Sequence, residues 1–178
     1  VNNGRLVASN AAGLFLGSDA AAGTFTNAST ARLEARAGAT ITFGASLTRT
    51  LNGDLRGDGT FAGATIALGS SSSLTPGDSS AVVGNLAETG NNLGKGASTV
   101  GLLDFSGNLT LNTTTQLNFQ LGDASAAGTS YDSVTVGDAL TLNGVLNVAA
   151  LTGFDEGTYR LFTYDTALAL AGGGLTLG

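Results

Sequence analysis

The sequence contains no cysteine, histidine, methionine or tryptophan, and one proline among its 178 residues. Without cysteine there are no disulfide bonds, thiolate metal ligands or cysteine nucleophiles. Without histidine the chain lacks the commonest general base, the commonest protein metal ligand and the usual charge switch near neutral pH. Catalysis would therefore have to rest on carboxylates, hydroxyls and a few basic side chains.

Charged residues are also scarce, at 11% of the chain, with a net charge of −6 and seven basic residues. So few basic residues cannot form the patch that nucleic-acid binding requires. No apolar run reaches transmembrane length, so we do not expect the chain itself to span a membrane. The chain has no initiator methionine and no visible signal peptide, so we expect a processed or excised piece of a longer protein.

The remaining composition favours a folded β protein. Hydrophobic residues make up 42% of the chain, which argues against disorder. They alternate with polar ones in short runs, as in Leu117-Asn118-Phe119-Gln120-Leu121, and Gly, Asn or Asp interrupts the runs. Period-2 alternation is typical of strands with one buried face, and the interruptions are typical of turns. Short strands cut so regularly predict a solenoid with coils of roughly 20 residues, hence about eight or nine turns.

Three stretches differ in regularity: irregular coils over 1–68, a polar, loop-rich insertion over 69–100, and regular coils over 101–178. The predicted strands are 6–8, 14–16, 24–26, 31–35, 39–43, 46–51, 60–62, 65–68, 101–105, 108–112, 116–121, 133–136, 139–142, 145–149, 158–164 and, more weakly, 168–177. The insertion contains the single proline, Pro76, and the single lysine, Lys95.

The alternation also predicts which side chains face inward in the regular stretch. The inward set is apolar: Phe105, Leu109, Leu111, Leu117, Phe119, Leu121, Val134, Val136, Leu140, Leu142, Leu146, Val148, Tyr159 and Leu161. Outward residues carry amides or hydroxyls, and stacked from coil to coil they would form hydrogen-bonded ladders: Asn118, Gln120, Thr135, Thr141 and Asn147. A β-sandwich would show similar alternation, but such a core usually has more large aromatic residues.

Several of these runs resemble, in order, motifs of bacterial autotransporter passenger domains. The run Leu74-Thr-Pro76-Gly-Asp-Ser79 is similar to the family's L-x-P-G-x-S element. It is followed by counterparts of G-N-L-T-L at 107–111, T-x-L-x-F-x-L at 115–121 and x-D-x-L-x-V-x-G from Tyr131 to Gly137. Counterparts of A-T-L-x-G-x-L-x-V at 139–148 and G-T-Y-x-L-L at 157–162 complete the series, which spans roughly 74–165.

This resemblance implies an all-β fold, a right-handed parallel β-helix that is a fragment of a longer passenger. It implies secretion to the surface of a Gram-negative bacterium, tethered to the outer membrane or released. The implied partner is the C-terminal β-barrel translocator of the same precursor. Residues 101–165 resemble the autochaperone-like coils that fold first and template the rest.

No group of residues in the sequence is a strong candidate for a catalytic or metal-binding site. Gly77-Asp78-Ser79 resembles a serine-hydrolase motif, but its serine has no histidine to activate it, and the run reads as a turn after Pro76. The carboxylates of Asp54, Asp58, Asp132, Asp138, Asp155 and Glu156 lie beside glycine or at turns, where we expect them to bind local backbone. The run 53–59 lacks the spacing of a calcium loop. We therefore predict no metal or cofactor.

Three functions remain open. The first is a non-enzymatic surface stalk or adhesin that acts by self-association or by binding a host-surface or matrix ligand. The outward ladder residues above would mediate self-association, and Phe162 and Tyr164 are candidates for exposed aromatic contacts. The second is an autochaperone module for a passenger whose activity lies upstream. The third is a glycan-active β-helical enzyme using sparse carboxylates.

Overall fold

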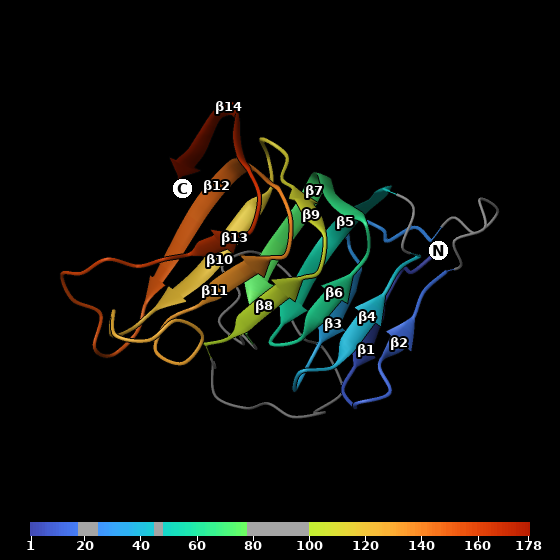
Figure 1. Ribbon diagram of the computed structural model, residues 1–178, viewed down its shortest axis with the longest axis horizontal. Helices are drawn as coiled ribbons and strands as arrows, with labels where there is room; N and C mark the ends of the chain where they lie inside the picture. The colour runs from blue at the N-terminus through green and yellow to red at the C-terminus, as the bar shows by residue number, and fades with distance from the viewer. Residues whose placement is uncertain (18–24, 45–47, 78–99) are drawn as a thin grey trace.

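The computed structural model describes residues 1–17, 25–44, 48–77 and 100–178 (Figure 1). Within these ranges all regular secondary structure is β-strand. The strands are β1 (Arg5–Ala8), β2 (Leu14–Phe15), β3 (Arg32–Ala35), β4 (Thr40–Thr42), β5 (Thr48–Gly57), β6 (Thr60–Ala62), β7 (Thr65–Pro76), β8 (Leu102–Phe105), β9 (Asn108–Thr110), β10 (Gln116–Leu121), β11 (Ser133–Val136), β12 (Leu140–Ala150), β13 (Phe162–Tyr164) and β14 (Leu168–Leu177).

The strands form two sheets, and neighbouring strands in each are parallel. The first sheet has the order β1-β3-β5-β7-β10-β12-β14, with β9 between β7 and β12, and the second has the order β13-β11-β8-β6-β4-β2. The chain crosses from one sheet to the other and returns one position further along the first (Figure 1). The predicted all-β, parallel-strand solenoid is confirmed.

The coils differ in length, which makes them fewer than predicted. Asp54, Ser73 and Gln116 occupy the same position in three consecutive coils. The coil from Asp54 to Ser73 is short, whereas the coil from Ser73 to Gln116 is much longer. The path through the first sheet therefore contains seven strands. The expected eight or nine turns are an overestimate for the described residues, since the connections after β7, β10 and β12 lengthen their coils.

Two predicted turns are bends inside continuous strands. The sequence suggests breaks at Asn52-Gly53 and Asn143-Gly144, yet β5 and β12 continue through them with a register shift. Both glycines have positive φ, 74° and 115°. A Cβ atom on Gly53 would lie 2.2 Å from the carbonyl oxygen of Ala31, and one on Gly144 would lie 2.6 Å from that of Thr115. Glycine therefore lets the strand bend directly against the preceding coil.

The polar stretch predicted over 69–100 differs at its start. Residues Gly69 to Pro76 continue β7, with Ser73 opposite Asp54 and Leu74 opposite Leu55. This serine-rich run forms a strand because Leu74 is fully buried and the Ser73 hydroxyl donates to Asp54. Residues 78–99, which include Asp78, Ser79 and Lys95, lie outside the described part of the chain.

Two other predicted strands are shorter or absent. Phe25 and Thr26 are not in a strand, although Asn27 makes an isolated parallel bridge with Asn2. The strand predicted over 158–164 begins only at Phe162. Its first residues belong to a loop instead, because the hydroxyl of Tyr159 donates to the carbonyl oxygen of Gly122, 2.7 Å away in the preceding loop.

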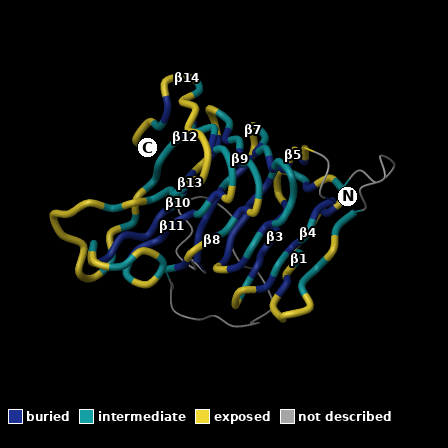
Figure 2. Tube along the Cα trace, viewed as in Figure 1, coloured by how far each residue is buried: buried dark blue, intermediate teal, exposed yellow. Residues whose placement is uncertain are grey.

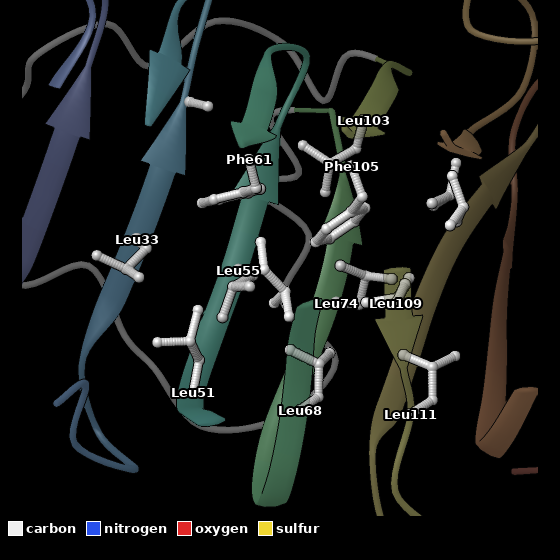
Figure 3. Packing of buried hydrophobic residues seen from close by; sticks show 14 of the residues in the cluster. Leu33, Leu51, Leu55, Phe61, Leu68, Leu74, Leu103, Phe105, Leu109 and Leu111 are labelled. Atoms are coloured by element: carbon white, nitrogen blue, oxygen red, sulfur yellow. The ribbon is translucent and has the colours of Figure 1, made fainter. Parts of the chain in front are cut away.

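A ladder of leucines forms the centre of the core. One leucine from each strand of the first-sheet path lies in register with the next: Leu6, Leu33, Leu55, Leu74, Leu117, Leu146 and Leu177. Phenylalanines from the second sheet face them, and the rings of Phe61 and Phe105 stack with centroids 5.6 Å apart (Figure 3). Figure 2 shows that burial is greatest in the central strands, whereas β14 and many of the loops are exposed.

Most of the predicted inward set is buried or packs against this core. Val148 is the exception, at 45% exposed. It lies in register with the buried Phe119, but β14 pairs with β12 only as far as Leu146. No β14 residue therefore covers Val148.

The leucine ladder gives a graded stability prediction. Leu117→Ala should lower the free energy of unfolding by about 3 kcal/mol, because Leu117 is fully buried between two coils. Leu177→Ala, at the same register position but 83% exposed, should change it by less than about 0.5 kcal/mol. Urea denaturation measures both, and equal losses would contradict the stacked-coil core.

Candidate interaction surface

The outward side of the first sheet carries a row of polar side chains, here called the outward ladder. They alternate with the inward leucines and therefore point away from the core. The members are Arg5, Arg32, Glu34, Asp54, Arg56, Ser73, Thr75, Gln116, Asn118 and Asn147. The ladder has a charged half on β1, β3 and β5 and an amide half on β10 and β12.

Asp54 is the centre of the charged half. Its carboxylate accepts hydrogen bonds from Arg56 Nε at 2.6 Å and Ser73 Oγ at 2.9 Å, and Arg32 Nε lies 3.4 Å from it. Thr75 Oγ1 donates to it as well, at 3.2 Å. The sequence suggested that Asp54 binds local backbone at a turn. That prediction is wrong, because Asp54 lies within β5 and its carboxylate joins groups from three successive coils.

A second ion-pair group lies beside it on β1 and β3. Arg5 Nη2 is 2.8 Å from Glu34 Oε2, and Arg36 also pairs with Glu34. Glu34 is fully buried, and Asp54 and Arg56 are nearly so. Buried charges of this kind require their partners, and removing one partner is strongly destabilising. The charged half therefore holds coils together and offers little accessible surface.

The amide half is uncharged and more accessible. Asn147 Nδ2 donates to Asn118 Oδ1 at 3.0 Å and to Gln116 Oε1 at 3.1 Å. Asn118 Nδ2 donates to Thr75 Oγ1 at 3.3 Å, which links the two halves. Gln116 is exposed, and Asn118 and Asn147 are half-buried. The structure thus joins two predicted ladder residues, Asn118 and Asn147, and adds Gln116, whose period-2 relation to Asn118 is visible in the sequence.

The other three predicted ladder residues lie elsewhere. Gln120 is buried. Thr135 lies on the second sheet, in register with Asp104 and Thr163. Burial raises the pKa of Asp104, and a hydrogen bond with Thr135 opposes the shift. Thr141 lies before the bend in β12, in register with Thr110. The predicted residues therefore do not form one continuous surface.

The two predicted aromatic contacts on β13 differ in exposure. Phe162 is in register with the buried Val134, and its ring lies 5.5 Å from that of Phe119. Phe162 is half-buried against the core. Tyr164 is in register with Val136 and is 42% exposed.

Four of the remaining carboxylates have local or inter-coil hydrogen bonds. Asp58 accepts from the backbone N–H of Ala37, Asp155 from that of Glu156 and Asp123 from that of Ser125. Asp138 accepts from the hydroxyl of Thr166. In the described ranges, no three Asp, Glu, His or Cys side chains gather closely enough to hold a metal ion. The same ranges contain no helix with the length and apolarity to cross a membrane.

Asp132 clamps neighbouring strands together. One carboxylate oxygen accepts from the backbone N–H of Gly101 at 2.8 Å and the other from that of Gln120 at 2.7 Å. Gly101 precedes β8 and Gln120 belongs to β10, so the side chain ties the two sheets at one corner. Burial raises the pKa of Asp132 to about 7, and the two hydrogen bonds act in the opposite direction. The sequence predicts that Asp132 binds local backbone at a turn, and this is wrong, because both N–H groups belong to other segments of the chain.

Part of the chain is similar in sequence to a known adhesin. Over 87 residues, 47% of the chain, the sequence is 37% identical to the adhesin BmaC autotransporter of Brucella suis biovar 1 (strain 1330). The chain covers about 2% of the length of that protein. No family model matches the sequence. No solved structure matches it significantly.

The raised pKa of Asp132 predicts how stability depends on pH. The folded state binds this proton more tightly than the unfolded state, whose carboxyl group titrates near 3.8. Stability from this group is therefore greatest below that value and declines as pH rises toward about 7, by at most about 1.4 kcal/mol per pH unit.

The comparison variant is Asp132→Asn, which cannot titrate. Its side chain can accept from only one of the two N–H groups, so its free energy of unfolding should be lower than that of the parent chain at pH 5, but it should decline less between pH 5 and pH 7.5. Urea titrations across this range measure the difference between the two proteins, in which contributions from other carboxylates cancel. Parallel pH profiles would show that Asp132 does not titrate in this way.

Proposed function

Since its motif series, its parallel-strand solenoid and its sequence match all fit a β-helical fragment of an autotransporter passenger, we propose that this chain is a non-enzymatic stalk and adhesive segment that associates with a second copy of itself. Such a passenger lies outside the outer membrane of a Gram-negative bacterium, on the cell surface or released from it. Its partner within the precursor is the translocator that exports it.

The observation that carries this proposal is the amide half of the outward ladder. It is uncharged and accessible, and its amides lie in a row that follows the stacking of β10 and β12. A second copy can exchange hydrogen bonds with such a row without burying an unpaired charge. In the charged half of the same ladder only Arg5 is exposed; the other charged groups are buried and cannot make this contact.

The arrangement of carboxylates supports a non-enzymatic role. Asp54 is buried, and its carboxylate is already bound by two arginines and two hydroxyl donors, so it is not available to a substrate. Asp58, the first residue after β5, accepts from the backbone N–H of Ala37, two residues beyond the end of β3. These two carboxylates therefore serve structure in this proposal rather than glycan cleavage.

A second candidate is the folding role, favoured by contacts confined to 101–178. The Asp132 clamp, the Tyr159–Gly122 hydrogen bond and the pairing of β11 with β8 and β13 all lie within this range. A segment tied together by its own side chains can fold before its neighbours and present β8, β9 and β10 as a template for β6 and β7.

Asn147→Lys should weaken self-association at least tenfold, because two copies would bring like charges together across the amide half. Thr135→Lys and Thr141→Lys place the same charge on other surfaces and should leave association unchanged. Sedimentation velocity over a hundredfold concentration range measures this, with the thermal midpoint as a check on folding. If all three variants associate like the parent, or the parent stays monomeric throughout, self-association through this surface is excluded.

The folding role predicts that the two halves of the chain differ in their ability to fold alone. A fragment of residues 101–178 should unfold cooperatively in urea, whereas a fragment of residues 1–100 should not, since the clamps listed above lie only in the former. Circular dichroism at 218 nm follows each titration. Cooperative unfolding of 1–100 with equal midpoint would argue against a C-terminal folding nucleus.

A further inference from the structure

Two loops leave the solenoid at the same corner and pack on each other. Residues 122–132 connect β10 to β11, and residues 151–161 connect β12 to β13. Their aromatic rings form a row from the core toward solvent, in which Tyr131 is buried, Tyr159 is half-buried and Phe154 is 47% exposed. The ring centroids of Tyr131 and Tyr159 are 5.1 Å apart, and those of Tyr159 and Phe154 are 5.5 Å apart.

The row is held rigidly. The Tyr159 hydroxyl donates to the carbonyl oxygen of Gly122 at 2.7 Å, and it lies 3.1 Å from that of Asp155. The first loop is closed by a hydrogen bond from the N–H of Gly122 to the carbonyl oxygen of Ser130. Phe154 therefore stacks on a fixed ring, and its substantial exposure lets it offer apolar ring surface to a ligand.

An open pocket of about 550 Å³ lies between the same two loops, and its lining includes Ser130 and Thr152, which in the sequence lie one residue before Tyr131 and two before Phe154. Its lining combines hydroxyl, carboxylate and apolar groups: Asp123, Thr129, Ser130, Leu151 and Thr152, with the backbone of Gly122. Hydroxyls and a carboxylate beside an exposed ring match an oligosaccharide, whose pyranose rings have apolar C–H faces and hydroxyl-bearing edges.

The charged residues of the two loops favour an uncharged saccharide over an acidic one. Their exposed charged residues are Asp123, Asp155, Glu156 and Arg160, so acidic groups outnumber the single cation. Acidic sugars would meet repulsion here, whereas uncharged ones would not. We propose that the pocket and the outer face of Phe154 bind a neutral oligosaccharide. This site goes beyond the proposed self-association and shares none of the residues of the outward ladder.

The chain contains no tryptophan, so Phe154→Trp introduces a single fluorescent reporter into the site while keeping an aromatic platform. The probes are hexasaccharides of glucose, mannose and N-acetylglucosamine, with a galacturonic acid hexasaccharide as the anionic comparator. We expect saturable emission changes with at least one neutral probe and binding at least tenfold weaker for the anionic one. Tyr164→Trp is the matched control, an exposed aromatic position on β13, and should show no change.

Calorimetry on the unlabelled chain completes the test. The neutral probe should bind the parent, and Phe154→Ala should weaken binding at least tenfold with an unchanged thermal midpoint. The site is refuted if no neutral probe gives a saturable change, if both reporters respond equally, if Phe154→Ala binds like the parent, or if the uronate binds as tightly. Sedimentation without saccharide tests self-association separately, so either proposal can fail alone.

Discussion

The structure depends on one constraint, which is that successive coils hydrogen-bond to each other as parallel strands in register. Because of this register, the residue at a given position in one coil lies on its counterpart in the next. A choice of leucine at one inward position is repeated in every strand of the first-sheet path, from Leu6 to Leu177. A slip of one residue in any coil would turn its whole apolar set outward, so the register is held by burial as well as by backbone hydrogen bonds.

The same register stacks the outward residues, where it creates a problem of charge. Arg5 lies on Arg32 in register, and like charges stacked this way would repel. The chain resolves this with acidic residues in the adjacent positions, since Glu34 pairs with Arg5 and Asp54 pairs with Arg32. On β10 and β12 amides replace the charges, and each amide can donate to one neighbour and accept from another. The outward ladder therefore changes from an enclosed ionic network into an open amide row along one face.

Period-2 alternation in the sequence predicts whether a side chain points inward or outward. It does not predict where a strand continues through a bend, because that depends on the neighbouring coils. The positions of most inward residues on β8 to β12 follow from alternation alone. The bend at Gly53 does not, because only the approach of the Ala31 carbonyl from the previous coil shows that the strand continues through it. Likewise, β7 runs through a serine-rich segment because Asp54, nineteen residues away in sequence, accepts from Ser73.

The same limit applies to the residues that were predicted to form the outward ladder. Asn118 and Asn147 share a surface because they occupy equivalent positions of consecutive coils, which the repeated alternation signals. Thr135 and Thr141 satisfy the same local pattern but belong to different surfaces. Thr135 lies on the second sheet, and Thr141 lies on the first sheet before the bend in β12. A local pattern gives the inward or outward direction, but it gives neither the sheet nor the side of a bend. The signal for the charged half was present in the alternating charges of Arg32-x-Glu34 and Asp54-x-Arg56, but its meaning depends on which coils are adjacent.

The register also determines where ligand-binding features can develop. From β6 onward, the connections that return to the first sheet are short, at 63–64, 106–107, 137–139 and 165–167, and the first three stack against one another. Two connections that leave the first sheet, at 122–132 and 151–161, are longer. A change of length there alters neither the register of the strands nor the leucine ladder. Variation is therefore tolerated at this corner, and the row of rings ending in Phe154 lies on the part of the coil that can change without unfolding the solenoid.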